Sequence, residues 1–289
     1  MGVLTGIYVI AGGYMATAIN DFVQGCIMLV GICAVVGAIL NTQGGFSEAL
    51  HNLAAVSDST TTNGDVPGIY ASFFGPEPVN LLGVVLLTSL GTWGLPQMVQ
   101  KFYAIKSEDA IHKGTVISTI FALVVSGGCY FMGGFGRLFS DQVDVATEGY
   151  DAIVPTMLSN LPELLIAIVV ILVLSASMST LSALVMTSSS TITLDLLKGN
   201  MVKKMNDFQA VFIIRCFIVV FIIISMVIAI IQYKYSISFI AQLMGVSWGA
   251  LAGAFLAPFL YSLYWKKATK AACWASFLFG AGVMSLNLL

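Results

Sequence analysis

Hydroxyl side chains dominate one stretch of this sequence, and hydroxyl oxygens can bind a hard cation such as sodium. Eleven of the nineteen residues from 175 to 193 are serine or threonine. Ser175, Ser179 and Ser182 fall at i, i+4 and i+7, on one face of a helix, and Thr180 lies beside Ser179. Hydroxyls and backbone carbonyls one turn earlier can together supply the several oxygens that such an ion requires. The same pattern is also typical of close helix packing, in which each hydroxyl bonds back to a carbonyl.

Asp21 is the only carboxylate among the first 47 residues, and it directly follows Asn20. Aspartate is favoured at the N-cap of a helix, and Gln24 stands three residues later, as in a capping box. The carboxylate could also bind a cation or form part of a gate near the middle of a membrane. Both roles are compatible, because a carboxylate that caps a helix keeps lone pairs for a ligand.

Two glycines and a proline, Gly91, Gly94 and Pro96, interrupt an apolar stretch that would otherwise form a regular helix. Proline removes a backbone donor and kinks a helix, and glycine weakens it. Non-helical backbone inside a membrane is tolerated where it is buried in protein or lines a wet cavity. A break with Trp93 and Gln97 beside it is typical of the substrate site of secondary transporters, and the alternative is a kink that serves packing.

The low content of charged residues indicates a membrane protein. Of the 289 residues 9% are charged, against about 25% in a soluble domain, while 58% are hydrophobic and the mean hydropathy is +0.95. These values exclude a soluble enzyme, a nucleic-acid-binding protein and a disordered chain. Runs of about 20 apolar residues without strand-like alternation predict an all-α polytopic membrane protein. We expect about eight transmembrane helices, at residues 3–18, 21–41, 80–100, 114–136, 164–187, 208–232, 236–264 and 271–289.

Lysine and arginine residues are distributed unevenly between the connections. Ten of the twelve lie in or beside the connections that follow the third, fifth and seventh expected spans, and only Arg137 and Lys234 lie on the opposite side. The carboxylates of that opposite side are Glu48, Asp58, Asp65, Glu77, Asp141, Asp144, Glu148, Asp151 and Glu163. The positive-inside rule therefore places the basic connections in the cytoplasm and the two long acidic connections, 42–79 and 137–163, outside.

Several of these stretches together resemble the sodium:solute symporter family, which includes sodium symporters of proline, pantothenate, sugars and sialic acid. The resemblance covers essentially the whole chain and implies a leucine-transporter-type fold of two inverted five-helix repeats. It rests on Gly12-Gly13-Tyr14 with Asn20-Asp21 and Gln24-Gly25, on Trp93-Gly94-Leu95-Pro96-Gln97 with Ala104-Ile105-Lys106-Ser107, on Met178-Ser179-Thr180-Leu181-Ser182 with Ser188-Ser189 and Asp195-Leu196, and on Tyr264-Trp265-Lys266-Lys267-Ala268-Thr269.

The resemblance also implies which residues bind sodium. The carbonyl of Ala176 and the hydroxyls of Ser179 and Thr180 match the sodium site that is usual in the family. Asp21 and Ser182 match a second sodium position that is found in some members. Sodium would accordingly be the transported coupling ion.

A solute site is implied at the broken helix. The residues that match the substrate-facing break of the sixth fold helix are Ser89, Thr92, Trp93, Pro96 and Gln97. Pro96 corresponds to a proline of the proline transporters. Two residues depart from the family pattern: Thr92 replaces an aromatic residue, and Ala183 stands where members with the second sodium position tend to have a serine.

The expected spans match only part of the implied fold. The first matches the end of fold helix four, the second to seventh match helices five to ten, and the eighth matches an additional helix. We therefore expect a single transporter domain over residues 1–289 that is N-terminally incomplete, with the second inverted repeat at about 80–264. Fold helix one, which supplies the other half of the sodium site in this family, has no counterpart, in agreement with an apolar start that carries no cation before Lys101.

These features predict sodium-coupled symport of a small organic solute, such as pantothenate or an amino acid, across a bacterial plasma membrane. The expected partners are the solute, sodium and the lipid bilayer, with no role for nucleic acid. An alternative is a transporter-like sensory membrane domain, as in sensor kinases that carry a domain of this family. We do not expect an enzyme, because His51 and His112 fall in connections and no carboxylate is paired within a span.

Overall fold

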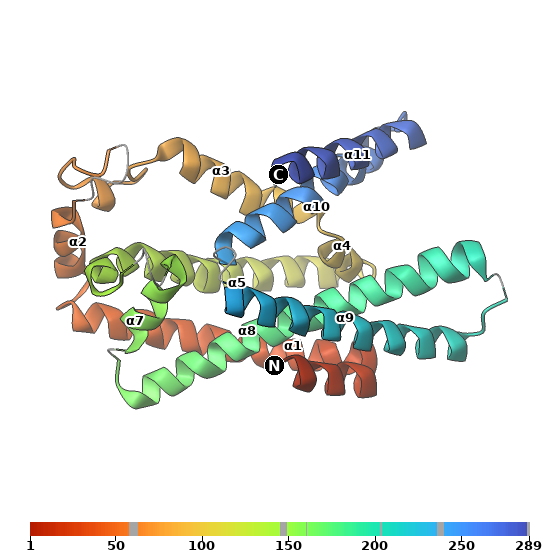
Figure 1. Ribbon diagram of the computed structural model, residues 1–289, viewed down its shortest axis with the longest axis horizontal. Helices are drawn as coiled ribbons and strands as arrows, with labels where there is room; N and C mark the ends of the chain where they lie inside the picture. The colour runs from red at the N-terminus through yellow and green to blue at the C-terminus, as the bar shows by residue number, and fades with distance from the viewer. Residues whose placement is uncertain (58–62, 145–148, 160, 203, 236–239, 288–289) are drawn as a thin grey trace. The chain divides into compact units, whose positions relative to one another are not determined.

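Helices form the regular secondary structure throughout the described part of the chain, so the all-α prediction is confirmed (Figure 1). The computed structural model describes residues 1–57, 63–144, 149–159, 161–202, 204–235 and 240–287. Asp58, Glu148 and Lys203, which entered the charge pattern, lie outside these residues. Residues 236–239 and 288–289, at the edges of two expected spans, also lie outside them.

The helices fall into two compact units, each of which is described by itself. The first unit comprises Met1–Ile39, Gly114–Met132 and Leu158–Ile237, and the second comprises Leu40–Lys113, Gly133–Met157 and Ser238–Leu289. The main helices of the first unit are α1 (Gly2–Thr42), α5 (Glu108–Phe135), α8 (Glu163–Ser190), its π-helical continuation η5 (Thr191–Met201) and α9 (Asp207–Tyr235). Those of the second are α2 (Phe46–Ala55), η1 (Ile69–Ala71), α3 (Pro78–Ser89), η2 (Gly91–Gly94), α4 (Pro96–Phe102), η3 (Gly136–Gln142), η4 (Tyr150–Ala152), α7 (Ile153–Ser159), α10 (Ile240–Tyr264) and α11 (Lys270–Asn287).

Gly13 divides α1, which is 41 residues long, with backbone angles that favour glycine (φ 59°, ψ −153°). At 1.5 Å per residue the segment 2–12 is about 16 Å long, which is too short for a hydrocarbon core of about 30 Å. The segment 14–42 is long enough to cross it. The division predicted from the sequence, between residues 18 and 21, is wrong because helical backbone continues through those residues.

The described residues contain five helices that are long and apolar enough to span a membrane, or six if one bent pair is counted as a span. They are Gly2–Thr42, Glu108–Ser140, Glu163–Met201, Asp207–Tyr235 and Leu243–Tyr264, with the pair Pro78–Gly94 and Pro96–Phe102 as the sixth. The first two of the eight expected spans share α1. The last expected span corresponds to a shorter apolar helix, Lys270–Met284.

The core of the first unit joins the beginning of α1 to α8 and α9. Val9, Val185, Ile218 and Ile222 are buried together in this core. The part of α1 before Gly13 contacts α9 through glycine. A Cβ atom added at Gly6 would lie 3.0 Å from the Cδ1 atom of Ile222. Small residues let helices approach closely in a membrane, where apolar lipid supplies no hydrophobic drive between them.

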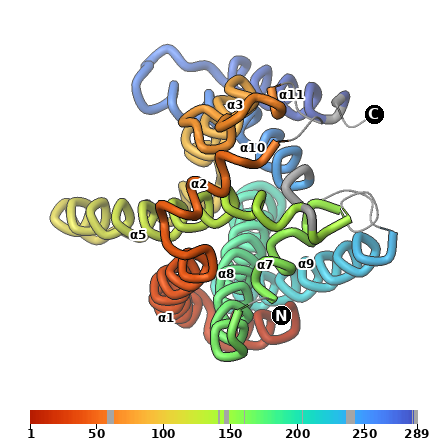
Figure 2. The backbone as a smooth tube through the Cα atoms, turned by 90° about the vertical axis from the view of Figure 1, so that its left-hand side faces the viewer, coloured from red at the N-terminus to blue at the C-terminus, as the bar shows by residue number. Residues whose placement is uncertain are grey.

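The later part of α1 packs against two other helices of the same unit. A Cβ atom at Gly31 would lie 2.7 Å from the Cδ1 atom of Leu172 in α8. A Cβ atom at Gly128 of α5 would lie 2.6 Å from the Cγ1 atom of Ile32. Figure 2 shows α1 and α8 side by side, and Figure 1 shows them running in opposite directions.

In the second unit, the bent pair α3–η2 and α4 packs on α10. The bend between the two helical parts is 52°, and it occurs at Leu95, whose extended backbone (φ −78°, ψ 121°) separates η2 from α4. The predicted break near Gly91, Gly94 and Pro96 is thereby confirmed. A Cβ atom at Gly94 would lie 2.8 Å from the backbone nitrogen of Leu256 in α10.

The two long connections contain short helices and are joined by one aromatic–cation contact within the second unit. The guanidinium group of Arg137 in η3 donates a hydrogen bond of 2.7 Å to the hydroxyl of Tyr70 in η1. Its central carbon also lies 4.7 Å from the centre of the Tyr70 ring. The contact fixes one long connection to the other by a hydrogen bond and a cation–π interaction.

The contact of Gly94 with α10 predicts a matched pair of alanine substitutions. Gly94→Ala places a methyl group against the backbone of Leu256, which cannot move aside, so we expect a loss of about 1–3 kcal/mol in unfolding free energy. The added methyl group of Gly83→Ala in α3 meets no atom within 4 Å and should stabilise the helix by about 0.5–1 kcal/mol. Thermal unfolding of the two variants in detergent measures both changes in stability. Equal stability of the two variants would contradict the packing of η2 on α10.

Candidate sodium and solute sites

The hydroxyl stretch of α8 bonds back onto its own helix, as one of the two interpretations of its sequence predicted. The hydroxyl of Thr180 donates to the carbonyl oxygen of Ala176 at 3.0 Å. The hydroxyl of Ser182 donates to the carbonyl oxygen of Ser179 at 2.9 Å. A hydroxyl that donates its proton in this way keeps its lone pairs. The oxygens of Thr180 and Ala176 therefore form a close pair that could still contact one cation.

These side chains lie on different faces of α8. Ser175 and Ser182 are buried, and Ser189, a further seven residues along, is also buried and donates to the carbonyl of Val185 at 2.6 Å. Ser179 is half-buried, whereas Thr180 is exposed. The sequence placed Ser175, Ser179 and Ser182 on one face, and the structure makes that face the buried one, with Ser179 at its edge.

Polar side chains are also buried in α1, in the same unit. Gln24 is 5% exposed, and Thr17 is buried with its hydroxyl bonded to the carbonyl of Gly13 at 2.9 Å. The Oε1 atom of Gln24 and the Nδ2 atom of Asn20 are buried without a hydrogen-bond partner among the described residues. Asp21 is half-buried in the interior of α1, so the N-cap interpretation was wrong, because the helix continues on both sides of it.

The contact between Gly31 and Leu172 marks a point at which α1 and α8 pack together. The two helices run in opposite directions (Figure 1), so residues 20–24 of α1 and residues 175–182 of α8 lie on the same side of this contact.

Tyr8 is a polar contact of α8 that the sequence analysis missed. Its hydroxyl donates to the carbonyl oxygen of Met178 at 3.2 Å, which ties the beginning of α1 to the centre of the hydroxyl stretch. A tyrosine inside an apolar membrane segment signals such a bond, because its hydroxyl needs a partner when it is buried.

The predicted solute residues gather at the bend between α3 and α4 in the second unit. The hydroxyls of Ser89 and Thr92 bond back to the carbonyls of Val85 and of Ser89, the latter at 2.9 Å. Trp93 in η2 is 54% exposed, Pro96 is the first residue of α4, and Gln97 is half-buried. The bend brings these five predicted residues together, and the five predicted sodium residues lie in the first unit.

Comparison with known proteins decides the family. The sequence profile described as Sodium:solute symporter family matches residues 1–280. The chain belongs to this family. It is therefore a multi-pass integral membrane protein of a family of sodium-coupled solute transporters, and it is not an enzyme.

Individual members of the family are identical to the chain at about a quarter of the aligned residues. The chain is 25% identical to the "Osmoregulated proline transporter OpuE" of Bacillus subtilis and 25% identical to the "Sodium/pantothenate symporter" of Escherichia coli, each over 279 residues. It is 28% identical to the "Sodium/proline symporter" of Staphylococcus aureus over 284 residues. These matches cover 96% of the chain but 54%, 55% and 52% of the relatives, so the chain spans about half their length.

The buried carbonyl oxygen of Gln24 predicts how one substitution changes the stability of the chain in sodium-free buffer. Gln24→Leu removes a buried carbonyl oxygen that has no partner, so we expect the unfolding free energy to rise by about 1–2 kcal/mol. Gln43→Leu is the matched control, because Gln43 accepts a hydrogen bond from Asn52 at 3.4 Å and its loss should bring no gain. Thermal unfolding in detergent measures both. A destabilised Gln24→Leu variant would show that the amide serves the fold instead of a ligand.

Proposed function

We propose that this chain carries the ion- and solute-binding helices of a sodium-coupled symporter for a small organic solute. A carboxylate such as pantothenate or an amino acid such as proline is the substrate class, since the printed names of the relatives concern these solutes. The observation that carries the proposal is the buried Oε1 atom of Gln24, which has no hydrogen-bond partner among the described residues and stands one helical turn from Asp21 in the apolar helix α1. Ionisable groups inside membrane spans are costly and serve function as a rule.

One sodium ion binds at the exposed edge of α8. Its ligands from this chain are the carbonyl of Ala176 and the hydroxyls of Ser179 and Thr180. Support comes from the 3.0 Å spacing between the Thr180 hydroxyl and the Ala176 carbonyl, because two oxygens that close can share an ion. Thr180 is exposed, so further oxygens must come from water or from another part of the assembled transporter.

A second sodium ion binds between α1 and α8. Asp21 supplies a negative charge and Ser182 a hydroxyl, and the unpartnered carbonyl oxygen of Gln24 is available one helical turn away. The alanine at position 183 removes one hydroxyl that some family members have. The partner-free amide of Gln24 offers a substitute oxygen on the facing helix.

The solute binds at the bend formed by α3, η2 and α4. The bend exposes the indole of Trp93 beside the amide of Gln97, with Ser89, Thr92 and Pro96 around it. In the leucine-transporter-type fold such a broken helix lies within the second inverted repeat, here about residues 80–264. We include in this proposal the eight transmembrane helices that the sequence predicts.

Transport then follows from coupling between the two kinds of site. Sodium bound to α8 stabilises the outward-open state, solute binding closes the bent helix, and both are released inward in an alternating-access cycle. The coupling is a free energy shared between sites, so sodium raises solute affinity by the same factor by which solute raises sodium affinity.

Sodium-driven uptake tests the assignment of the first ion. In cells that express the full reading frame and lack other carriers, Ser179→Ala and Thr180→Ala should each raise the half-saturating sodium concentration about tenfold, the equivalent of about 1.4 kcal/mol. Ser177→Ala on the same helix is the control, because Ser177 is exposed and outside the ligand set. Uptake of radiolabelled pantothenate and proline is the readout. Unchanged sodium dependence in both variants would refute the site.

A further inference from the structure

A group of three lysines lies at the connection between α10 and α11 without any nearby acid in the sequence. Lys266, Lys267 and Lys270 are all exposed. Neither α10, α11 nor the connection between them contains an aspartate or glutamate, and the last carboxylate of the chain is Asp207. The hairpin formed by α10 and α11 therefore carries an uncompensated positive charge at one end, which favours an anionic ligand.

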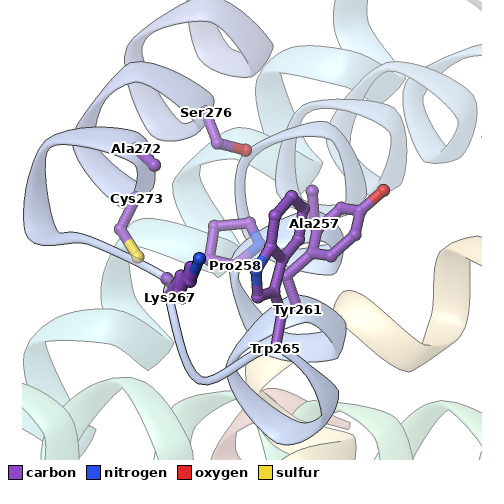
Figure 3. Close-up of a pocket in the computed structure, with 9 residues that line it drawn as sticks. Ala257, Pro258, Tyr261, Trp265, Lys267, Ala272, Cys273 and Ser276 are labelled. Atoms are coloured by element: carbon purple, nitrogen blue, oxygen red, sulfur yellow. The ribbon is translucent and has the colours of Figure 1, made fainter.

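A cavity opens beside these lysines within the second unit. It has a volume of about 190 Å³ and is lined from α10 by Pro258 and Tyr261, from the connection by Lys267 and from α11 by Cys273 and Ser276. Figure 3 shows the Lys267 side chain between Cys273 and Pro258. One cation, a hydroxyl and a phenol thus border an otherwise apolar cavity.

Aromatic side chains place this end of the hairpin at the depth of lipid headgroups. Tyr261, Tyr264, Trp265 and Trp274 are all more than half exposed, and the rings of Tyr261 and Trp265 lie 5.7 Å apart in an edge-to-face arrangement. Tyrosine and tryptophan are enriched at the membrane–water interface. The candidate span within α10 ends at Tyr264, so the lysines begin where the hydrocarbon region stops.

A second, open groove extends from the lysines toward the apolar part of the hairpin. It has a volume of about 470 Å³ and runs past Lys270 and Cys273 to Phe255 and Phe277. Seven residues separate Lys270 from Phe277, which corresponds to about 10 Å along a helix. Pro258, Ala268 and Cys273 line both hollows, so the cavity beside Lys267 and the groove beside Lys270 adjoin.

We propose that this hairpin binds an anionic glycerophospholipid, with the headgroup phosphate at Lys267 and Lys270 and an acyl chain along the groove that ends at Phe255 and Phe277. The lysines supply the charge that recognises a phosphate diester, and basic pockets beside membrane helices bind such headgroups. The apolar groove distinguishes a lipid from a soluble phosphate, because a free phosphate has no part that could occupy it.

Native mass spectrometry of the full chain in detergent tests the proposal with phosphatidylglycerol and phosphatidylcholine of equal chain length. The unchanged chain should retain phosphatidylglycerol preferentially. Lys267→Gln with Lys270→Gln should weaken this binding at least tenfold, since each lysine near a headgroup contributes about fivefold, whereas Lys267→Arg with Lys270→Arg should preserve it. Lys101→Gln with Lys106→Gln is the matched control, because these exposed lysines end another helix of the same unit, and it should leave binding unchanged.

Two further measurements separate the lipid from other ligands and from misfolding. Ala257→Phe narrows the cavity without removing a cation and should also weaken binding at least fivefold, and size-exclusion elution checks each variant. Excess glycerol 3-phosphate or inorganic phosphate should not displace the lipid. The proposal is overturned if the double glutamine variant binds phosphatidylglycerol as the unchanged chain does, if phosphatidylcholine binds equally well, or if either soluble phosphate displaces the lipid.

Discussion

A polar group inside hydrocarbon must find its partner within the protein, and this constraint shapes the described helices of the chain. Thr180 and Ser182 meet it by bonding to carbonyls of their own helix, and Tyr8 meets it by bonding to Met178. The Nδ2 atom of Asn20 and the Oε1 atom of Gln24 do not meet it within the described residues. Such exceptions are costly, and their position beside Asp21 in α1 is the physical reason to propose an ion there.

Close approach of backbones supplies the precision that an ion site requires. In the first unit Gly31 admits Leu172, and in the second a Cβ atom at Gly280 would collide with the backbone of Gly253. Dispersion forces and interhelical hydrogen bonds hold membrane helices together, so contacts of this kind set both their spacing and their register. The contact at Gly31 therefore fixes a point at which α1 and α8 meet, ten residues from Asp21 in α1.

Much of the fold could be predicted, because composition and backbone chemistry act locally. The scarcity of charge predicted membrane helices, and Pro96 with its neighbouring glycines predicted the bend. The division of α1 could not be placed, because Gly12 and Gly13 are adjacent and either could take the positive φ that the structure shows at Gly13. The π-helical turn from Thr191 and the contact between Arg137 and Tyr70 likewise depend on neighbours that are distant in the sequence. For the proposed site, residue types predicted candidate ligands, but which serines are buried depends on how α8 packs.

The most direct test of the ion site is the melting temperature of the purified chain as sodium chloride replaces choline chloride at constant ionic strength. A ligand that binds only the folded state stabilises it, by about 2.7 kcal/mol at one hundred times its dissociation constant. The account predicts a sodium-specific rise that is retained in full in Ser177→Ala and reduced in Asp21→Asn combined with Ser182→Ala, which removes the ion between α1 and α8. An equal rise in choline chloride, or an undiminished rise in the double variant, would contradict it.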